Sequence, residues 1–244
     1  MSVLRKLAVP LTVAGGVGVL LLLGGVLFNG TVSAMINQSH GRVGQPDLRT
    51  MRLVNEGRNV FRGDTFGDQA VWGGVLGLHK AIEGAKLGGV GPGVSPKTAL
   101  ALGLKVDSAR IPAKVAAAIK AGKVNLDDPK VTLALLKLNA VVGVKGFFNR
   151  GGTLSSVGIT CALCHSTVDD SFAPGIGRRL DGWPNQDLNV GAIVAAAPNL
   201  TPLEQSLGVD EATLKKVLLG WGPGFFNAEL DLDGKAIGPD GTPH

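Results

Sequence analysis

The two cysteines of this 244-residue chain lie three positions apart, and a histidine follows the second directly, in Cys161-Ala162-Leu163-Cys164-His165. Two thiols at this spacing on one helical turn match the two vinyl groups of a porphyrin, and the adjacent imidazole can reach its iron. The motif therefore predicts one covalent haem c, bound through Cys161 and Cys164 with His165 as an axial ligand. A chain with this motif has to fold around a large apolar plate.

Other uses of the two cysteines fit the sequence less well. A redox-active cysteine pair would follow a strand in an alternating α/β pattern, which is absent here. A zinc site would need a second pair of ligands at a suitable spacing. A disulfide between such close positions would constrain almost no loop and would stabilise the fold little.

The first 34 residues have the pattern of an export segment. Arg5 and Lys6 precede an uncharged apolar run over residues 7–28, and Val32-Ser33-Ala34 resembles a cleavage site. The run is also close to the length of a membrane span. Residues 1–34 are therefore predicted to be either a signal peptide cleaved near Ala34 or an N-terminal anchor in the inner membrane. Either outcome places the remaining chain in the periplasm.

Residues 35–244 are predicted to form one mainly α-helical domain, with a helical part at 45–150 and a haem-attachment part at 151–244. The chain is 45% hydrophobic, which is enough for a compact core. No segment shows sustained alternation of apolar and polar residues between turns, so no strand is predicted. A capping box, Thr201-Pro202-Leu203-Glu204, is expected to open one helix. The other helices are predicted at residues 47–61, 68–83, 96–102, 112–121, 129–138 and 210–219.

Beyond the C-A-L-C-H motif, the chain resembles bacterial periplasmic c-type cytochromes over most of residues 45–235. Glu56–Phe61 resembles the "G-x-x-x-F" first helix of small cytochromes c. Three further segments, Arg62–Asp68, Val157–Cys161 and Gly177–Trp183, resemble an uncharacterised proteobacterial group with an enlarged layout. The resemblance implies a cytochrome c-like haem domain, with a long helical insertion between the first helix and the haem motif.

The second axial ligand of the iron is not evident from the sequence. No methionine follows Met51, and the one histidine after His165 is His244. His79 is the first candidate, because helical spacing places it on one face with Trp72, Val75, Leu76 and Ile82. An ordinary core histidine is the competing interpretation. Met51, His40, a residue beyond His244 and an open sixth position also remain.

Other charged residues give weaker indications. Arg178 and Arg179 follow the haem motif and could pair with the haem propionates, or could lie at the surface. An approximate calcium loop is formed by Glu229, Asp231, Asp233, Gly234 and Asp240, but a solvated turn explains these residues better. The formal net charge of +5 comes from scattered lysines and arginines, which argues against a nucleic-acid partner.

These features predict a monohaem c-type cytochrome that transfers electrons to a redox protein in the periplasm or inner membrane. An electron carrier is favoured over an enzyme. The alternatives are a haem enzyme or sensor with an open distal site, such as a peroxidase-like protein, and a cytochrome subunit of a periplasmic dehydrogenase.

Overall fold

The computed structural model describes residues 47–224, 229–230 and 236–237. The chain divides into two compact units, Met1–Leu53 and Val54–His244. The predicted export segment, residues 1–34, lies outside the described residues. Within the described part of the chain, no helix is both long and apolar enough to cross a membrane.

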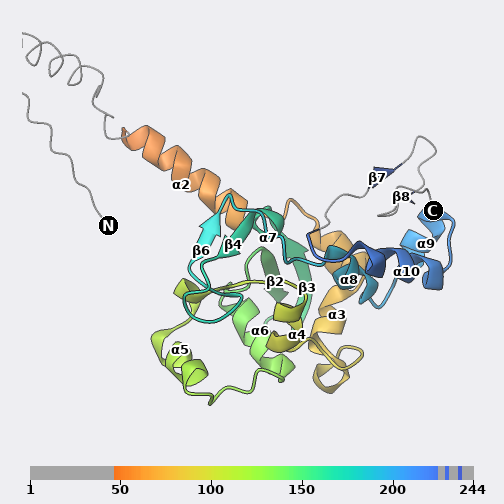
Figure 1. Ribbon diagram of the computed structural model, residues 1–244, viewed down its shortest axis with the longest axis horizontal. Coiled ribbons are helices and arrows are strands. Elements are labelled where there is room, and N and C mark those ends of the chain that lie inside the picture. Colours follow the sequence, from red (N-terminus) through yellow and green to blue (C-terminus); the bar gives the residue numbers. More distant parts are fainter. Residues whose placement is uncertain (1–46, 225–228, 231–235, 238–244) are drawn as a thin grey trace, which may run out of the picture. The chain divides into compact units, whose positions relative to one another are not determined.

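The fold is 48% helical and 13% strand, which confirms the mainly α prediction. Figure 1 shows the helices distributed around several short strands. The helices are α2 (Leu48–Gly63), η1 (Ala70–Val75), α3 (Leu78–Glu83), η2 (Ala85–Leu87), α4 (Pro96–Ala101), η3 (Ser108–Arg110), α5 (Ala113–Lys120), α6 (Pro129–Lys137), α7 (Ala162–His165), α8 (Val190–Ala195), α9 (Thr201–Leu207) and α10 (Glu211–Trp221).

Two of the predicted helices, α4 and α6, begin directly after a capping residue. The Ser95 hydroxyl accepts a hydrogen bond from Thr98 N at 3.1 Å, and Pro96 follows as the first residue of α4. Asp128 caps α6 in the same way, accepting from Lys130 N at 2.9 Å. A side-chain oxygen before a first-turn proline satisfies one free N–H and removes another, so the helix start is fixed locally.

The predicted capping box at Thr201 is wrong. Helix α9 begins at Thr201 itself, and Leu200 occupies the cap position without a side-chain hydrogen bond. Leu200 is 3% exposed and its backbone is already right-handed helical, with φ −96° and ψ −7°. Burial of Leu200 therefore starts the helix one residue earlier, and leaves Thr201 without the extended backbone that a capping side chain needs.

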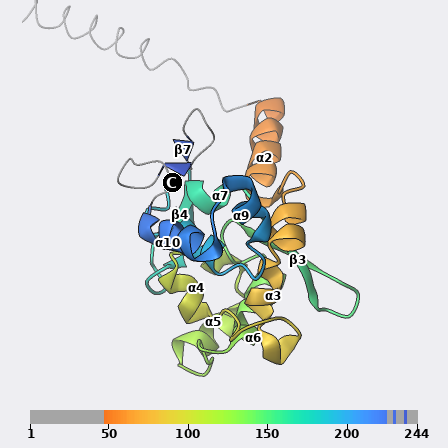
Figure 2. The same ribbon diagram turned by 90° about the vertical axis from the view of Figure 1, so that its right-hand side faces the viewer.

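The structure also contains strands that were not predicted. They are β1 (Val106–Asp107), β2 (Val144–Phe148), β3 (Leu154–Ile159), β4 (Ser166–Val168), β5 (Ile176–Gly177), β6 (Arg179–Asp181), β7 (Glu229–Leu230) and β8 (Ala236–Ile237). They pair only in twos, as β1–β5, β2–β3, β4–β6 and β7–β8. The β2–β3 hairpin is the largest, and Figure 2 shows its tip extending beyond α3. All five residues of β2 are half-buried, so the strand does not have one buried and one exposed face. An alternation of apolar and polar residues, which reflects two such faces, is therefore not expected in its sequence.

The predicted helix over residues 68–83 is two helices in the structure. A π-helix, η1, ends at Val75, and Gly77 then adopts a left-handed backbone with φ 69° before α3 begins. A left-handed residue breaks the repeat of a right-handed helix, so a helical face cannot continue through it. The two halves pack against β3 and form part of the main core.

Candidate haem-attachment site

The C-A-L-C-H motif forms one turn of right-handed helix. Cys161 caps α7 with a helical backbone, φ −52° and ψ −27°, and His165 N donates to the Cys161 carbonyl at 3.2 Å. Residues three and four positions apart are neighbours on a helix surface. Cys161, Cys164 and His165 therefore share one side of the turn, and both thiols are free of a disulfide.

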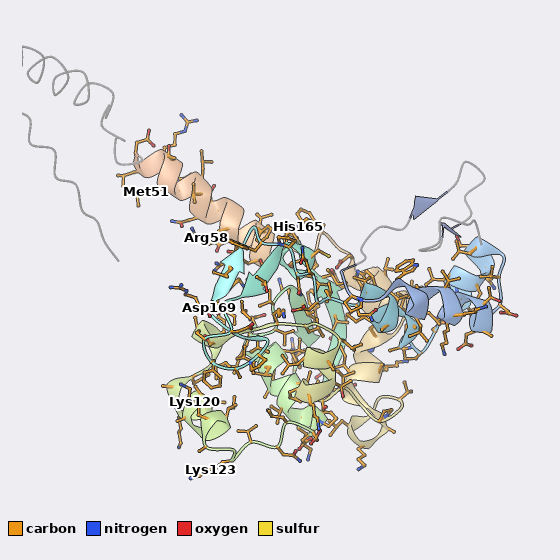
Figure 3. The ribbon with its side chains drawn as sticks, viewed as in Figure 1. Met51, Arg58, Lys120, Lys123, His165 and Asp169 are labelled. Atoms are coloured by element: carbon orange, nitrogen blue, oxygen red, sulfur yellow. The ribbon has the colours of Figure 1, made fainter. Side chains whose placement is uncertain are left out.

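The two residues between the cysteines anchor this turn in the core. Ala162 is 0% exposed and Leu163 is 5% exposed, whereas Cys161 and His165 are exposed and Cys164 is half-buried. Ala162 belongs to a small cluster against which Phe61 of α2 packs. Figure 3 shows His165 at the surface near the end of α2. The turn thus presents its thiols and imidazole outward while its apolar side is fixed.

A glycine allows the chain to approach the turn closely. A Cβ atom at Gly143 would lie 2.1 Å from the Cα and N atoms of Leu163, and Gly143 has φ +75°. Both the contact and the backbone angle require glycine. Gly143 also accepts a hydrogen bond from Thr160 N at 3.0 Å, directly before the motif.

The loop after β6 closes the other end of the turn. Gly182 N donates to the His165 carbonyl at 2.8 Å, and Asn185 N donates to the Cys164 carbonyl at 2.9 Å. Asn185 is 2% exposed, and its side-chain amide donates to the Gly103 carbonyl. Between these two bonds the loop carries Trp183, which is 63% exposed. An indole left this exposed provides apolar surface next to the motif.

Cys161, Cys164 and His165 provide the donor set that a covalently attached haem would need, two thiols and one imidazole on the same side of a turn. Burial, followed by repulsion from Cys161, raises the pKa of the Cys164 thiol. Within residues 47–224 and the two short strands beyond, no three His, Cys, Asp or Glu side chains are grouped to hold a metal ion.

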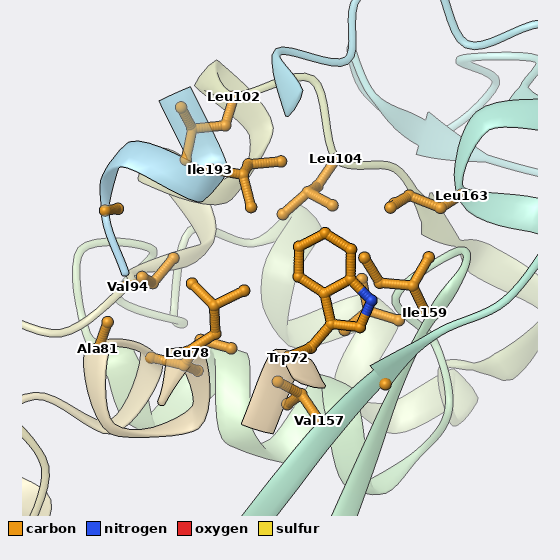
Figure 4. Close-up of a pocket in the computed structure, with 14 residues that line it drawn as sticks. Trp72, Leu78, Ala81, Val94, Leu102, Leu104, Val157, Ile159, Leu163 and Ile193 are labelled. Carbon is orange, nitrogen blue, oxygen red and sulfur yellow. The ribbon is translucent and has the colours of Figure 1, made fainter. Parts of the chain in front are cut away.

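An apolar pocket lies on the core side of the turn. Its empty volume is about 630 Å³, and its walls come from η1, α3, β3, α8 and the segment around α4. Figure 4 shows Trp72, Ile159 and Leu163 among the side chains that line it. Because Leu163 belongs to the buried side of α7, this pocket is separate from the side that carries the thiols.

The single helical face that was expected to carry His79 together with Trp72 and Ile82 does not form in the structure. Trp72 and Ile82 line the apolar pocket, whereas Val75 and His79 line a different pocket with Gln69, Ser155, Ser156 and Asn199. The left-handed Gly77 lies between Val75 and His79 and interrupts the helical repeat that would have kept these four residues on one face. No residue of the C-A-L-C-H motif lines the His79 pocket.

His79 Nδ1 is buried and has no hydrogen-bond partner within the described residues. The assignment of His79 as an iron ligand stays a prediction.

The other candidates for the second ligand are less informative. Met51 lies in α2 and is 50% exposed. His40 and His244 lie outside the described residues. Of the approximate calcium loop, only Glu229 is described, in β7, which pairs antiparallel with β8. An EF-hand loop is flanked by helices, so these strands differ from that motif.

The two arginines that follow the motif have different environments. Arg178 is exposed, and its Nε lies 3.5 Å from Asp169 Oδ2. The Arg179 side chain is 6% exposed, and its Nε lies 3.7 Å from Oδ2 of Asp107, whose side chain is 5% exposed. Burial lowers the pKa of Arg179, and nearby Asp107 opposes that shift. The sequence did not indicate that only one of this pair is buried, because Arg178 and Arg179 are identical neighbours.

Sequence reasoning also missed an ion pair between distant parts of the chain. Arg62 of α2 donates through Nε to Asp181 Oδ2 at 2.7 Å, and Ser166 Oγ donates to Asp181 Oδ1 at 2.9 Å. Ser166 directly follows His165, so Asp181 links the end of α2 to the chain leaving the motif. Arg62 and Asp181 are 119 positions apart, so no local sequence pattern indicates that they pair.

Comparisons with protein-family models, with curated proteins and with solved structures found no match for this chain.

Proposed function

We propose that this chain is a monohaem c-type cytochrome that transfers electrons in the periplasm. The observation that carries the proposal is the exposed turn of Cys161, Cys164 and His165, fixed from below by the buried Ala162 and Leu163. In this proposal the two thiols form thioether bonds to one haem, and the His165 imidazole is an axial ligand. The haem, when bound, supplies reversible one-electron chemistry.

The protein's own residues would position the haem and control its surroundings. The hydrogen bonds from Gly182 and Asn185 hold the carbonyls of His165 and Cys164, which limits rotation of the turn. Phe61, packed on the Ala162 cluster, and the exposed Trp183 provide apolar surface near the thiols. Attachment at the surface suits exchange with a redox protein, because electron transfer needs the donor and acceptor to approach closely. The predicted export segment, residues 1–34, supports a periplasmic location or a tether to the inner membrane.

Spectroscopy of the exported, full-length protein tests the proposed function. A carrier should be oxidised and reduced reversibly by one electron per chain, remain low-spin in both states, and fail to bind carbon monoxide. His165→Ala should remove the low-spin spectrum while the haem stays attached through the cysteines. A high-spin ferric protein that binds carbon monoxide once reduced would contradict the carrier function.

A haem enzyme or sensor with an open distal site is the second candidate. The observation that favours it is the position of the other described histidine, His79, which lines a pocket without any motif residue. An iron with five ligands has a free position for a peroxide or a small gas. Peroxide-dependent oxidation of a dye by the wild-type protein, lost in His165→Ala, would support this function over electron transfer.

A further inference from the structure

A pocket lined by four cationic side chains lies beside the end of α2. Its walls include Arg62, Arg110, Lys145 and Arg179, together with the amides Asn59 and Asn139. These residues come from α2, η3, β2, β6 and the turn after α6, and the empty volume is about 800 Å³. We refer to this site as the basic pocket. It is distinct from the apolar pocket and from the pocket of His79.

The positive charge of the basic pocket is only partly balanced by the protein. Arg62 pairs with Asp181, and Arg179 lies 3.7 Å from Asp107. Lys145 Nζ donates to the Gly63 carbonyl at 2.9 Å, which is a neutral group. Arg110 makes no hydrogen bond or ion pair within the described residues. The four cations thus have two carboxylates as partners, and two positive charges stay uncompensated.

Arg179 is a buried cation of this set whose Nε lacks a hydrogen bond within the described residues. Its side chain is 6% exposed, and its buried Nε has no hydrogen-bond partner in the part of the chain that the structure describes. The carboxylate of Asp107 is too distant, at 3.7 Å, for a hydrogen bond. Asp107 and Asp181 are close enough to attract this cation, and Arg62 and Arg110 are close enough to repel it. A buried N–H group without a hydrogen-bond acceptor has a free-energy cost, and an anion bound beside the Nε of Arg179 would offset it.

We propose that the basic pocket binds a small oxyanion with at least two negative charges, of the phosphate class. The guanidinium groups of Arg110 and Arg179 carry forked donors that match the oxygens of such an anion. Arg62, whose Nε and Nη2 both donate to Asp181, and Lys145 add positive charge. The side-chain amides of Asn59 and Asn139 can donate to further oxygens. Two haem propionates would offer a similar pair of charges, so the test separates a free oxyanion from carboxylates of an attached haem. The proposal itself does not rest on haem attachment.

Calorimetric titration of the full-length protein with inorganic phosphate tests this proposal. One phosphate should bind per chain, more tightly at low ionic strength, since opposite charges are screened by salt. Acetate, with one charge, should bind more weakly. Arg110→Gln removes an exposed cation that has no protein partner and should leave the fold intact, while weakening phosphate binding by about tenfold or more. Arg178→Gln removes the same charge outside the pocket and should change the affinity by less than about twofold.

Three outcomes would overturn the proposal. The first is the absence of saturable phosphate binding to the folded wild-type protein. The second is an equal loss of affinity in Arg110→Gln and Arg178→Gln, which would indicate diffuse attraction by net charge. The third is binding to a folded Cys161→Ala/Cys164→Ala variant but not to the haem-loaded protein, which would show that propionates occupy the pocket.

Discussion

His165 and His79 lie in segments that the fold builds in opposite ways. The turn of His165 is closed within five residues, by the bond from its own N–H to the Cys161 carbonyl, and its buried side is Ala162 and Leu163. The segment of His79 spans a π-helix, a left-handed glycine and a short α-helix. A pattern contained in one turn survives in the fold, whereas a pattern over sixteen residues can be broken by a single glycine.

The two segments are nevertheless connected through one carboxylate. Asp68, at the start of the broken segment, accepts a hydrogen bond from Trp72 Nε1 at 3.0 Å and from Ile159 N at 3.1 Å. Ile159 ends β3, two residues before Cys161. The segment that failed to form one helix therefore fixes the strand leading into the attachment turn.

The largest expected effect is on the free energy of unfolding, through the contact between Gly143 and the helical turn over residues 161–165. Gly143→Ala would place a methyl group 2.1 Å from the Leu163 backbone and would also strain a φ of +75°. We expect a loss of about 3 kcal/mol or more in the free energy of unfolding, because neither backbone can move without disturbing the core. Urea denaturation followed by circular dichroism measures this loss.

A matched glycine separates the clash from the backbone strain. Gly208 has φ +68°, but a Cβ atom there would meet no atom within 4 Å. Gly208→Ala should therefore cost only about 1 to 2 kcal/mol, from the left-handed backbone alone. Equal losses in the two variants would show that the contact between Gly143 and Leu163 is not tight.

A smaller effect is expected where the predicted helix breaks. Gly77 has φ +69°, and a Cβ atom would contact only Pro198 at 3.9 Å, an ordinary distance. Gly77→Ala should lower the free energy of unfolding by about 1 to 2 kcal/mol. An increase in both stability and helical signal would instead indicate that one helix runs through residues 68–83.

The sequence predicted the parts of this fold that depend on neighbouring residues. Ser95-Pro96 and Asp128-Pro129 mark helix starts because the cap, the proline and the helix are contiguous. The helical turn over residues 161–165 was predictable for the same reason. The basic pocket was not, because Arg62, Arg110, Lys145 and Arg179 are separated by tens of positions. The β2–β3 hairpin was not predictable from alternating side chains. Its strands contain Gly146 and Gly158, where a Cβ atom would collide with neighbouring side chains, and glycines at these positions weaken the strand pattern in the sequence.

The link through Asp68 should appear in the pH dependence of stability. Burial raises the pKa of Asp68 above its ordinary 3.8, against the hydrogen bonds from Ile159 and Trp72. The folded state then holds the proton more tightly than the unfolded state. The contribution of Asp68 to stability is therefore present below pH 3.8 and is lost as the pH rises through the raised value.

Asp68→Asn should lack this decline in stability when thermal denaturation is measured across acidic pH. The exposed Asp127→Asn is the control, and an identical pH profile in both variants would exclude Asp68 as the source.

The smallest expected effect concerns the second iron ligand. If His79 binds the iron, His79→Ala should convert a low-spin absorption spectrum into a high-spin one. The separation of the His79 pocket from the motif favours an unchanged spectrum. Recording the oxidised spectra of wild type and His79→Ala therefore decides whether the ligand comes from this segment. Met51→Leu provides the corresponding test for the methionine of α2.

The central claim is covalent attachment of one haem at the exposed turn. The most direct measurement is the intact mass of the exported protein under denaturing conditions, after production in cells that attach haem to c-type cytochromes. We predict a mass equal to the polypeptide plus one haem, reduced to the polypeptide alone in Cys161→Ala/Cys164→Ala. A wild-type protein that carries no added haem mass, with free or disulfide-linked cysteines, would contradict the account.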